Sequence, residues 1–130
     1  ALLPETDWVF LAAPATPQSR AMIGAEELAA MKPSAWIVNV GRIVLIDQDA
    51  LIEACARRRI GGAFLDTVTP EPLPPEHPLW STANVIHSMH LSGRSQTRMF
   101  LRAAALFVEN ARAFAEGRPL RNEVDLAAGY

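Results

Sequence analysis

The sequence has 130 residues, half of them hydrophobic and a fifth charged, with a formal net charge of −2. This composition is typical of a globular domain, and the length suits one domain or part of a larger one. The small net charge gives no reason to expect nucleic acid or an anionic membrane as a partner. Cys55 is the single cysteine, which excludes an internal disulfide and fits a reducing, cytoplasmic location.

The ends and apolar runs of the chain bear on its processing. No apolar run approaches the roughly 20 residues that a membrane span needs. Pro4, Glu5 and Asp7 interrupt the amino terminus too early for a signal peptide. The chain begins without Met, and Leu2-Leu3 resembles the end of an earlier element. We therefore expect a fragment of a longer protein.

Apolar runs at residues 7–13, 35–40, 63–65 and 84–88 predict four strands. The run at 35–40 is rich in β-branched residues and shows little alternation, which is typical of strands buried on both faces of a parallel sheet. Gly41 follows it directly and is expected to free the backbone at the carboxyl end of the strand.

Three helices are predicted between and after these strands. The first begins at Gly24 and ends before Lys32-Pro33, and the second spans 48–59, capped by Asp47 and closed by Gly61-Gly62. The third spans 94–116 and has a charged stripe and a wide apolar arc, which predicts burial on more than one side. Residues 69–79 hold five of the ten prolines and predict a stiff loop.

Strands that alternate with helices predict an α/β fold with a parallel sheet. The chain lacks a strand–GxGxxG–helix unit, so a dinucleotide-binding sheet would be represented by its second half alone. We expect residues 1–93 to form that half of a Rossmann-type domain and residues 94–130 to form a long carboxyl-terminal helix and tail.

Arg42, Glu71 and His90 each follow one of three successive predicted strands. Loops at the carboxyl ends of parallel strands converge on one crevice, so we expect these side chains to meet. Arginine grips a carboxylate in a bidentate fork, and histidine exchanges a proton near neutral pH. Together they suit acid–base chemistry on an anionic substrate. Taken alone, Arg42 is as consistent with a surface or structural residue, Glu71 is more typical of a solvated loop residue, and His90 is more typical of a structural histidine.

Four other residues have simpler interpretations. Asp66 stands where it could cap the end of a strand, and His87 is interpreted as structural. His77, in the proline-rich loop, is expected to be solvated. Cys55, in a helix, is interpreted as a small core residue. No metal site is expected.

The chain resembles the carboxyl-terminal half of the D-isomer-specific 2-hydroxyacid dehydrogenases. Three segments carry the resemblance over nearly the whole chain. They are Lys32-Pro33 through Asn39-Val40-Gly41-Arg42 to Asp47-Gln48-Asp49-Ala50-Leu51, Leu65-Asp66 with Glu71-Pro72-Leu73-Pro74, and Asn84-Val85-Ile86 with His90 and Gly93. The end of the chain, Asn122-Glu123-Val124-Asp125 to Gly129-Tyr130, is similar to the ends of short members.

The resemblance implies a hydride transfer between NAD or NADP and a 2-oxoacid or D-2-hydroxyacid, as in the glyoxylate/hydroxypyruvate reductases. Arg42 would bind the substrate, His90 would exchange the proton, and Glu71 would pair with His90. Residues that would line the cofactor are Pro14, Thr16, Val40, Gly41, Arg42, Asp66, His90, Ser92 and Gly93. The last helix would pack on a substrate lobe, and a homodimer is expected.

Three departures from the family pattern stand out. Ile43 and Val44 replace small residues, so Ile43 is expected to narrow the site or shift its turn. Met89 replaces a proline before the histidine and is expected to loosen the aim of His90. Because the phosphate-binding loop and the substrate lobe are absent, the 130 residues alone are expected to be inactive. Alternatives are an NAD(H)-sensing, corepressor-like binding protein and an inactive remnant of the same fold.

Overall fold

The computed structural model describes residues 2–88, 90–93 and 98–128. The chain divides into two compact units, Ala1–Ser92 and Gly93–Tyr130. The first unit holds a sheet and the candidate site, and the second holds a long helix and the tail; each is described by itself.

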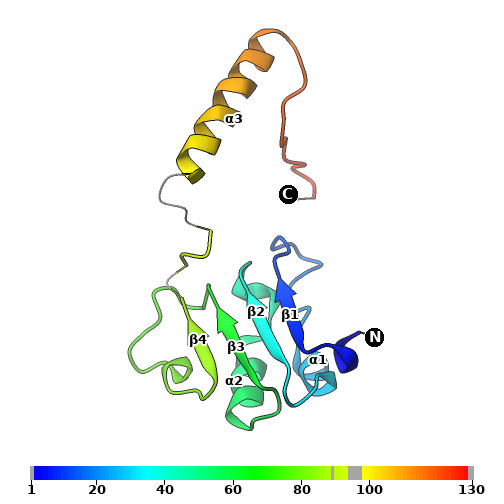
Figure 1. Cartoon of the computed structure of the whole chain (residues 1–130), viewed down its shortest axis with the longest axis vertical. Helices are drawn as coiled ribbons and strands as arrows, with labels where there is room; N and C mark the ends of the chain where they lie inside the picture. Colours follow the sequence, from blue (N-terminus) through cyan, green and yellow to red (C-terminus); the bar gives the residue numbers. More distant parts are fainter. Residues whose placement is uncertain (1, 89, 94–97, 129–130) are drawn as a thin grey trace. The chain divides into compact units, whose positions relative to one another are not determined.

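The first unit is built on a four-stranded parallel sheet with the order β1-β2-β3-β4 (Figure 1). The strands are β1 (Trp8–Leu11), β2 (Trp36–Asn39), β3 (Gly62–Leu65) and β4 (Val85–His87). Each lies on a predicted apolar run, within two residues of its bounds. The predicted α/β class and parallel sheet are therefore confirmed.

Two helices connect the first three strands, and both begin with the predicted caps. In α1 (Ala25–Ala30) the Glu27 carboxylate accepts a hydrogen bond from the Gly24 amide at 3.0 Å. In α2 (Gln48–Ala56) the Asp47 side chain accepts one from Ala50 N at 3.1 Å. Capping of this kind satisfies amides that have no partner inside the helix.

The predicted carboxyl end of α2 is wrong. The helix stops at Ala56, and the turn is closed by Arg58 in a left-handed conformation (φ 53°), with Arg59 N bonded to Ala54 O at 2.8 Å. Gly61 instead lets the chain just before β3 lie close to the backbone just before β2. A Cβ on Gly61 would lie 2.5 Å from Ser34 O.

Three short 3-10 helices were not predicted. They are η1 (Leu3–Glu5), η2 (Ile43–Leu45) and η3 (Pro78–Trp80). The second occupies the connection between β2 and α2, and the third lies at the end of the proline-rich loop.

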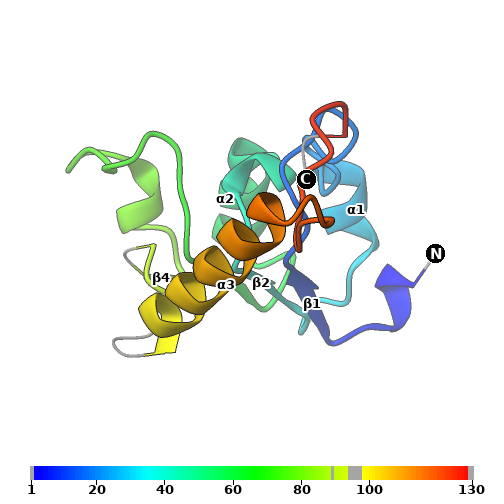
Figure 2. The ribbon, with the colours of Figure 1, turned by 90° about the horizontal axis from the view of Figure 1, so that it is seen from above.

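Both α1 and α2 cover the same face of the sheet (Figure 2). That face is buried in the core: Leu28 of α1 and Leu51 of α2 belong to one apolar cluster with Ile37 and Leu65. The opposite face carries Trp8 and Phe10 of β1 and, in register with Phe10, the side chains Val38, Phe64 and Ile86. Trp8, Phe10 and Ile86 are more than half exposed. Burial on both faces of the sheet was predicted. The described sheet is buried on the face covered by α1 and α2 and is partly exposed on the other.

The second unit contains α3 (Arg98–Ala115) and an irregular tail. The predicted start of this helix, at residue 94, lies outside the described residues. The tail folds back on the helix: Arg121 Nη1 contacts Glu109 Oε2 at 2.8 Å, and the Asn110 side chain bonds both backbone polar atoms of Arg121. Most large apolar side chains of α3 stay exposed in this unit.

Candidate active site

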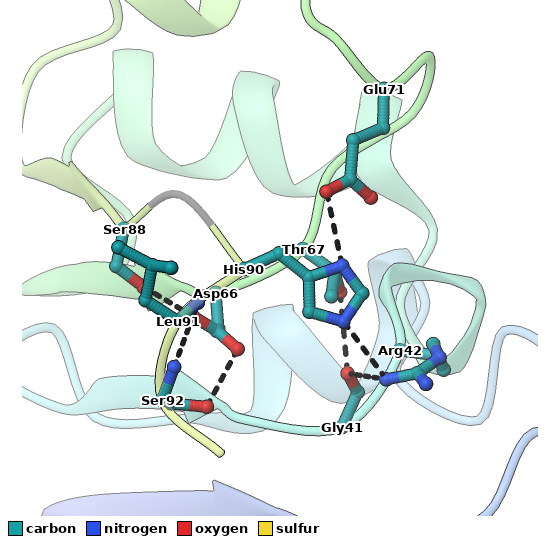
Figure 3. Close-up of polar contacts among 9 residues, drawn as sticks. All are labelled: Gly41, Arg42, Asp66, Thr67, Glu71, Ser88, His90, Leu91 and Ser92. Atoms are coloured by element: carbon teal, nitrogen blue, oxygen red, sulfur yellow. Dashed lines mark hydrogen bonds and ion pairs between the residues drawn. The ribbon is translucent and has the colours of Figure 1, made fainter. Parts of the chain in front are cut away.

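The carboxyl ends of β2, β3 and β4 meet at one edge of the sheet, as the crossover topology of parallel strands requires. Arg42 follows β2, Asp66 follows β3 and His90 follows β4 (Figure 3). Glu71 approaches His90 from the proline-rich loop (Figure 3). The three residues predicted to meet, Arg42, Glu71 and His90, therefore lie in one constellation.

The imidazole of His90 is contacted on both nitrogens. Nδ1 lies 3.0 Å from Glu71 Oε1, and Nε2 lies 3.4 Å from Arg42 Nη1. A carboxylate accepts hydrogen bonds and a guanidinium donates them, so the neutral ring carries its proton on Nδ1. The lone pair of Nε2 then faces the arginine. The side chains of His90 and Glu71 are 40% and 46% exposed, so small molecules can reach them.

The turn that carries Arg42 is organised by Asn39, which the sequence analysis did not single out. Asn39 is fully buried; its Nδ2 donates to Arg42 O at 3.0 Å and its Oδ1 accepts from Gly41 N at 3.0 Å. Gly41 has no left-handed backbone here. Its value is close approach, because a Cβ would lie 3.2 Å from Ala13 O and 3.1 Å from Leu45 Cδ1. An amide at the end of an apolar strand was the available signal for Asn39.

Asp66 ties β3 to the segment that follows β4. Its carboxylate accepts hydrogen bonds from the hydroxyl of Ser88, from Leu91 N at 2.8 Å, and from Ser92 N at 3.0 Å and its Oγ at 2.6 Å (Figure 3). Burial alone would raise the pKa of Asp66, but these hydrogen bonds outweigh it and lower the pKa to about 2. Asp66 is therefore a charged residue that anchors the segment after β4 to the end of β3, a larger role than the predicted strand-end cap.

The same anchor holds the backbone of His90. Asp66 O accepts from His90 N at 3.0 Å, and His90 adopts a left-handed conformation with φ 55°. A side chain in this region costs free energy on the order of 1 kcal/mol, which surrounding contacts must offset. Hydrogen bonds to Asp66 from three consecutive residues, 90–92, provide that restraint.

A cavity of about 340 Å³ lies beside Glu71 and is lined mainly by apolar side chains, among them Val68, Leu73 and Trp80. His87 also lines it; its Nε2 lies 3.2 Å from Leu79 O, and its ring packs edge-on against Trp80. These contacts agree with a structural histidine. His77 is half-buried and accepts a hydrogen bond from Leu79 N at 3.2 Å, so the prediction of a solvated ring is wrong.

The remaining predicted cofactor residues follow β1, β2 and β4 in the chain. Val40 follows β2 directly, and Pro14 and Thr16 lie in the loop after β1, where Ser19 Oγ donates to Pro14 O at 2.7 Å. Ser92 bonds Asp66, as described above, and Gly93 begins the second unit.

Three single positions depart from the family pattern, and two of them, Ile43 and Val44, lie in η2. Ile43 is buried in the apolar cluster, which accounts for a β-branched side chain there. Met89 lies outside the described residues.

Neither a metal site nor a membrane-spanning helix is found in the described part of the chain. No group of three or more His, Cys, Asp or Glu side chains there is arranged to hold a metal ion. Within the same residues, no helix is long and apolar enough to cross a membrane.

A parallel sheet with polar side chains gathered at its carboxyl edge defines part of a Rossmann-type dinucleotide-binding domain. Residues 1–92 match the model of the NAD-binding domain of the D-isomer-specific 2-hydroxyacid dehydrogenases. The chain belongs to this family, as its resemblance predicted.

Individual relatives agree with the family match. Glyoxylate/hydroxypyruvate reductase B of Pectobacterium carotovorum is 40% identical over 125 residues, which cover 95% of this chain and 38% of that protein. The chain spans about two fifths of the length of the curated relatives that it matches first.

Solved structures show the same fold. A D-isomer-specific 2-hydroxyacid dehydrogenase from Xanthobacter autotrophicus, in complex with NADPH and MES, has a TM-score of 0.87 and 37% identity, covering 99% of this chain and 54% of that chain. An NADPH-dependent glyoxylate/hydroxypyruvate reductase from Sinorhizobium meliloti, in complex with NADP and sulfate, has a TM-score of 0.87 and 29% identity, covering 98% and 41%.

Proposed function

We propose that this chain is the carboxyl-terminal part of an NAD(P)-dependent oxidoreductase that interconverts small 2-oxoacids and D-2-hydroxyacids. The contact series from Arg42 through His90 to Glu71 is the observation that carries the proposal. In the whole protein, residues 1–93 would contribute half of the nicotinamide-binding domain, and residues 94–130 would pack on a substrate lobe. A homodimer in the cytoplasm is part of the same proposal.

Arg42 binds and orients the substrate in this scheme. Its guanidinium is exposed and permanently charged, and its planar donors suit the carboxylate and carbonyl oxygens of a 2-oxoacid. Arg42 Nη1 and His90 Nε2 are 3.4 Å apart, so one carbonyl oxygen can lie within hydrogen-bond distance of both. Donors held at this oxygen stabilise the negative charge that develops on it during reduction.

His90 transfers the proton. In the reducing direction the protonated ring gives the proton on Nε2 to the carbonyl oxygen, while the carbonyl carbon receives hydride and becomes a carbinol carbon. The ring is left neutral with its proton on Nδ1, hydrogen-bonded to Glu71, and regains a proton from solvent. The reverse direction uses Nε2 as the base. Glu71 keeps the ring in the orientation and tautomer that both directions require.

The edge of the sheet fits a nicotinamide cofactor by the chemistry of its polar groups. Asp66 stays ionised and holds the amide and hydroxyl of Ser92 at this edge, where the guanidinium of Arg42 and the ring of His90 remain exposed to a ligand. When bound, the nicotinamide supplies or takes up the hydride. Val40, Gly41, Arg42, His90, Ser92 and Gly93 would line its nicotinamide side, and Pro14 and Thr16 would lie nearer the adenosine half.

The substrate class is tested with the full-length protein that contains this chain. Reduction of glyoxylate and hydroxypyruvate is followed by loss of NADH or NADPH absorbance, with pyruvate and phenylpyruvate as comparison substrates. We expect turnover of glyoxylate or hydroxypyruvate with at least one of the two cofactors, because relatives with these activities share about 40% identity with the chain.

Two outcomes would replace the proposal. Tight binding of NADH or NADPH without turnover of any 2-oxoacid would favour a cofactor-sensing binding protein. Neither binding nor turnover would favour an inactive remnant of the fold. The 130-residue chain assayed alone is expected to show no turnover, because groups that position both reactants would be missing.

A further inference from the structure

Gln48, the first residue of α2, binds the backbone of a distant loop with both ends of its side chain. Its Nε2 donates to Thr69 O at 2.6 Å, and its Oε1 accepts from Thr69 N at 2.9 Å. One amide thus satisfies both polar atoms of one peptide residue, although 21 positions separate the two residues. A paired contact of this geometry fixes the orientation of Thr69 as well as its distance from the helix.

The fixed residue stands two positions before Glu71. Pro70 and Pro72 flank the glutamate, and each ring locks its φ angle. A restraint on Thr69 therefore passes to Glu71 through a stiff segment. Without it, the glutamate would depend on its own contact with His90, made between side chains that are both about 40% exposed or more.

Gln48 begins the helix that follows the connection carrying Arg42, which lies six positions earlier in the chain. The two hydrogen bonds between Gln48 and Thr69, which we call the Gln48 clamp, hold the loop of Glu71 against the start of α2. The connection that presents Arg42 leads directly into this helix. The distance between the two charged groups on either side of His90 is set in part by this one amide.

We propose that Gln48 is a positioning residue for the acid–base site: it holds Glu71 at Nδ1 of His90 and thereby fixes the tautomer of the imidazole. This inference rests on the proposed function for its purpose, since a fixed Nδ1 proton leaves Nε2 to exchange a proton with substrate. Gln48 itself touches no reacting group. Its effect on His90 passes through Thr69 and Glu71.

The tautomer can be measured in the 130-residue chain without substrate or cofactor. The chain is labelled with ¹⁵N-histidine, and the ring nitrogen shifts of His90 are recorded at a pH at which the ring is neutral. We expect the wild-type ring to be protonated at Nδ1. Gln48→Ala should lower the ratio of the Nδ1–H to the Nε2–H form at least twofold, and Glu71→Ala should lower it at least as far.

Three further variants make the test decisive. Asp49→Ala removes an exposed side chain from the same helical turn and should leave the ratio unchanged. Gln48→Glu keeps the length of the side chain but loses the donor to Thr69 O; it should also lower the ratio, and it serves if Gln48→Ala fails to fold. In the Gln48→Ala/Glu71→Ala double variant the ratio should equal that of Glu71→Ala alone, because the effects share one path.

A wild-type ratio in folded Gln48→Ala or Gln48→Glu would overturn the inference, as would additive effects in the double variant. These results are independent of enzymatic turnover. If the Gln48 variants keep the wild-type tautomer ratio and the full-length protein shows normal turnover, the inference alone is refuted. If the Gln48 variants lower the ratio but the full-length protein turns over no 2-oxoacid, the proposed function alone is refuted.

Discussion

The Nδ1 atom of His90 lies 3.0 Å from Oε1 of Glu71, although the two residues are 19 positions apart and come from different connections of the sheet. Both side chains are substantially exposed. Ion pairs and charged hydrogen bonds in such surroundings contribute little to the stability of a fold. The contact is therefore better suited to orienting the imidazole than to stabilising the chain.

Glu71→Ala should separate these two roles. We expect the free energy of unfolding of the chain to change by less than about 1 kcal/mol, because the lost pair is exposed. Turnover by the full-length protein should fall by roughly tenfold or more, since a misoriented acid–base group loses much of its effect. Urea denaturation and steady-state kinetics measure the two quantities, and a large loss of stability with normal turnover would reverse the assignment.

His90→Ala in the full-length protein should reduce the turnover number by about 10²–10⁴-fold, the usual contribution of a general acid or base.

Arg42→Ala should reduce turnover severely and raise KM, because the carboxylate of the substrate loses its bidentate partner. Arg42→Lys keeps the charge without the planar fork and should recover part of the loss. His77→Ala, at a ring that caps η3, is the matched control and should leave turnover near normal.

The three residues of the constellation could be found from sequence because each follows an apolar run that forms a strand of a parallel sheet. Arg42 follows β2, Glu71 lies in the loop after β3 and His90 follows β4, so the carboxyl edge of the sheet brings all three together. The helix caps at Gly24 and Asp47 could also be predicted, because their signal lies within three residues of the sequence.

What the sequence could not give depends on long-range contacts or on backbone choices without a local signal. The partner of Gln48 is 21 positions away in the chain. The role of Asn39 depends on the path of the turn that brings Gly41 N and Arg42 O to its side chain, and the sequence has no local signal for that path. The end of α2 was misplaced because an arginine, Arg58, takes the left-handed position that glycine normally fills.

Asp66 should make the stability of the first unit depend on acid. Its pKa falls from the ordinary 3.8 to about 2 on folding, so the charged form favours the folded state. The contribution is complete above about pH 4 and is lost as the pH falls toward 2. Asp66→Asn should therefore be less stable than wild type at pH 7, and the difference should shrink between pH 4 and pH 2. Thermal denaturation at several pH values checks this, and a constant difference would contradict it.

Cys55 should be protected from thiol reagents in the folded chain. The residue is fully buried, and burial raises the pKa of its thiol to about 11. The thiolate is the reactive form, so both access and ionisation are unfavourable at neutral pH. Labelling by iodoacetamide at pH 8 should be slow without denaturant and fast in guanidinium chloride. Rapid labelling of the native chain would show that the helix around Cys55 opens readily.

The apolar surface of α3 predicts that the isolated chain self-associates. Phe100, Phe107 and Phe114 recur every seven residues and so share one stripe of the helix, and they are 69%, 73% and 78% exposed within their unit. Burying a phenylalanine side chain stabilises an assembly by about 1.5–3 kcal/mol, so a second copy is a favourable cover for the stripe.

Light scattering and sedimentation should show oligomers whose fraction grows with concentration. Phe107→Gln/Phe114→Gln should shift the chain toward the monomer, because it removes two of the three stripe residues. Arg102→Gln, a charge-removing change in the same helix, should not have this effect. A monodisperse wild-type monomer at high concentration would refute self-association, and unchanged oligomers in the double variant would move the contact away from the stripe on α3.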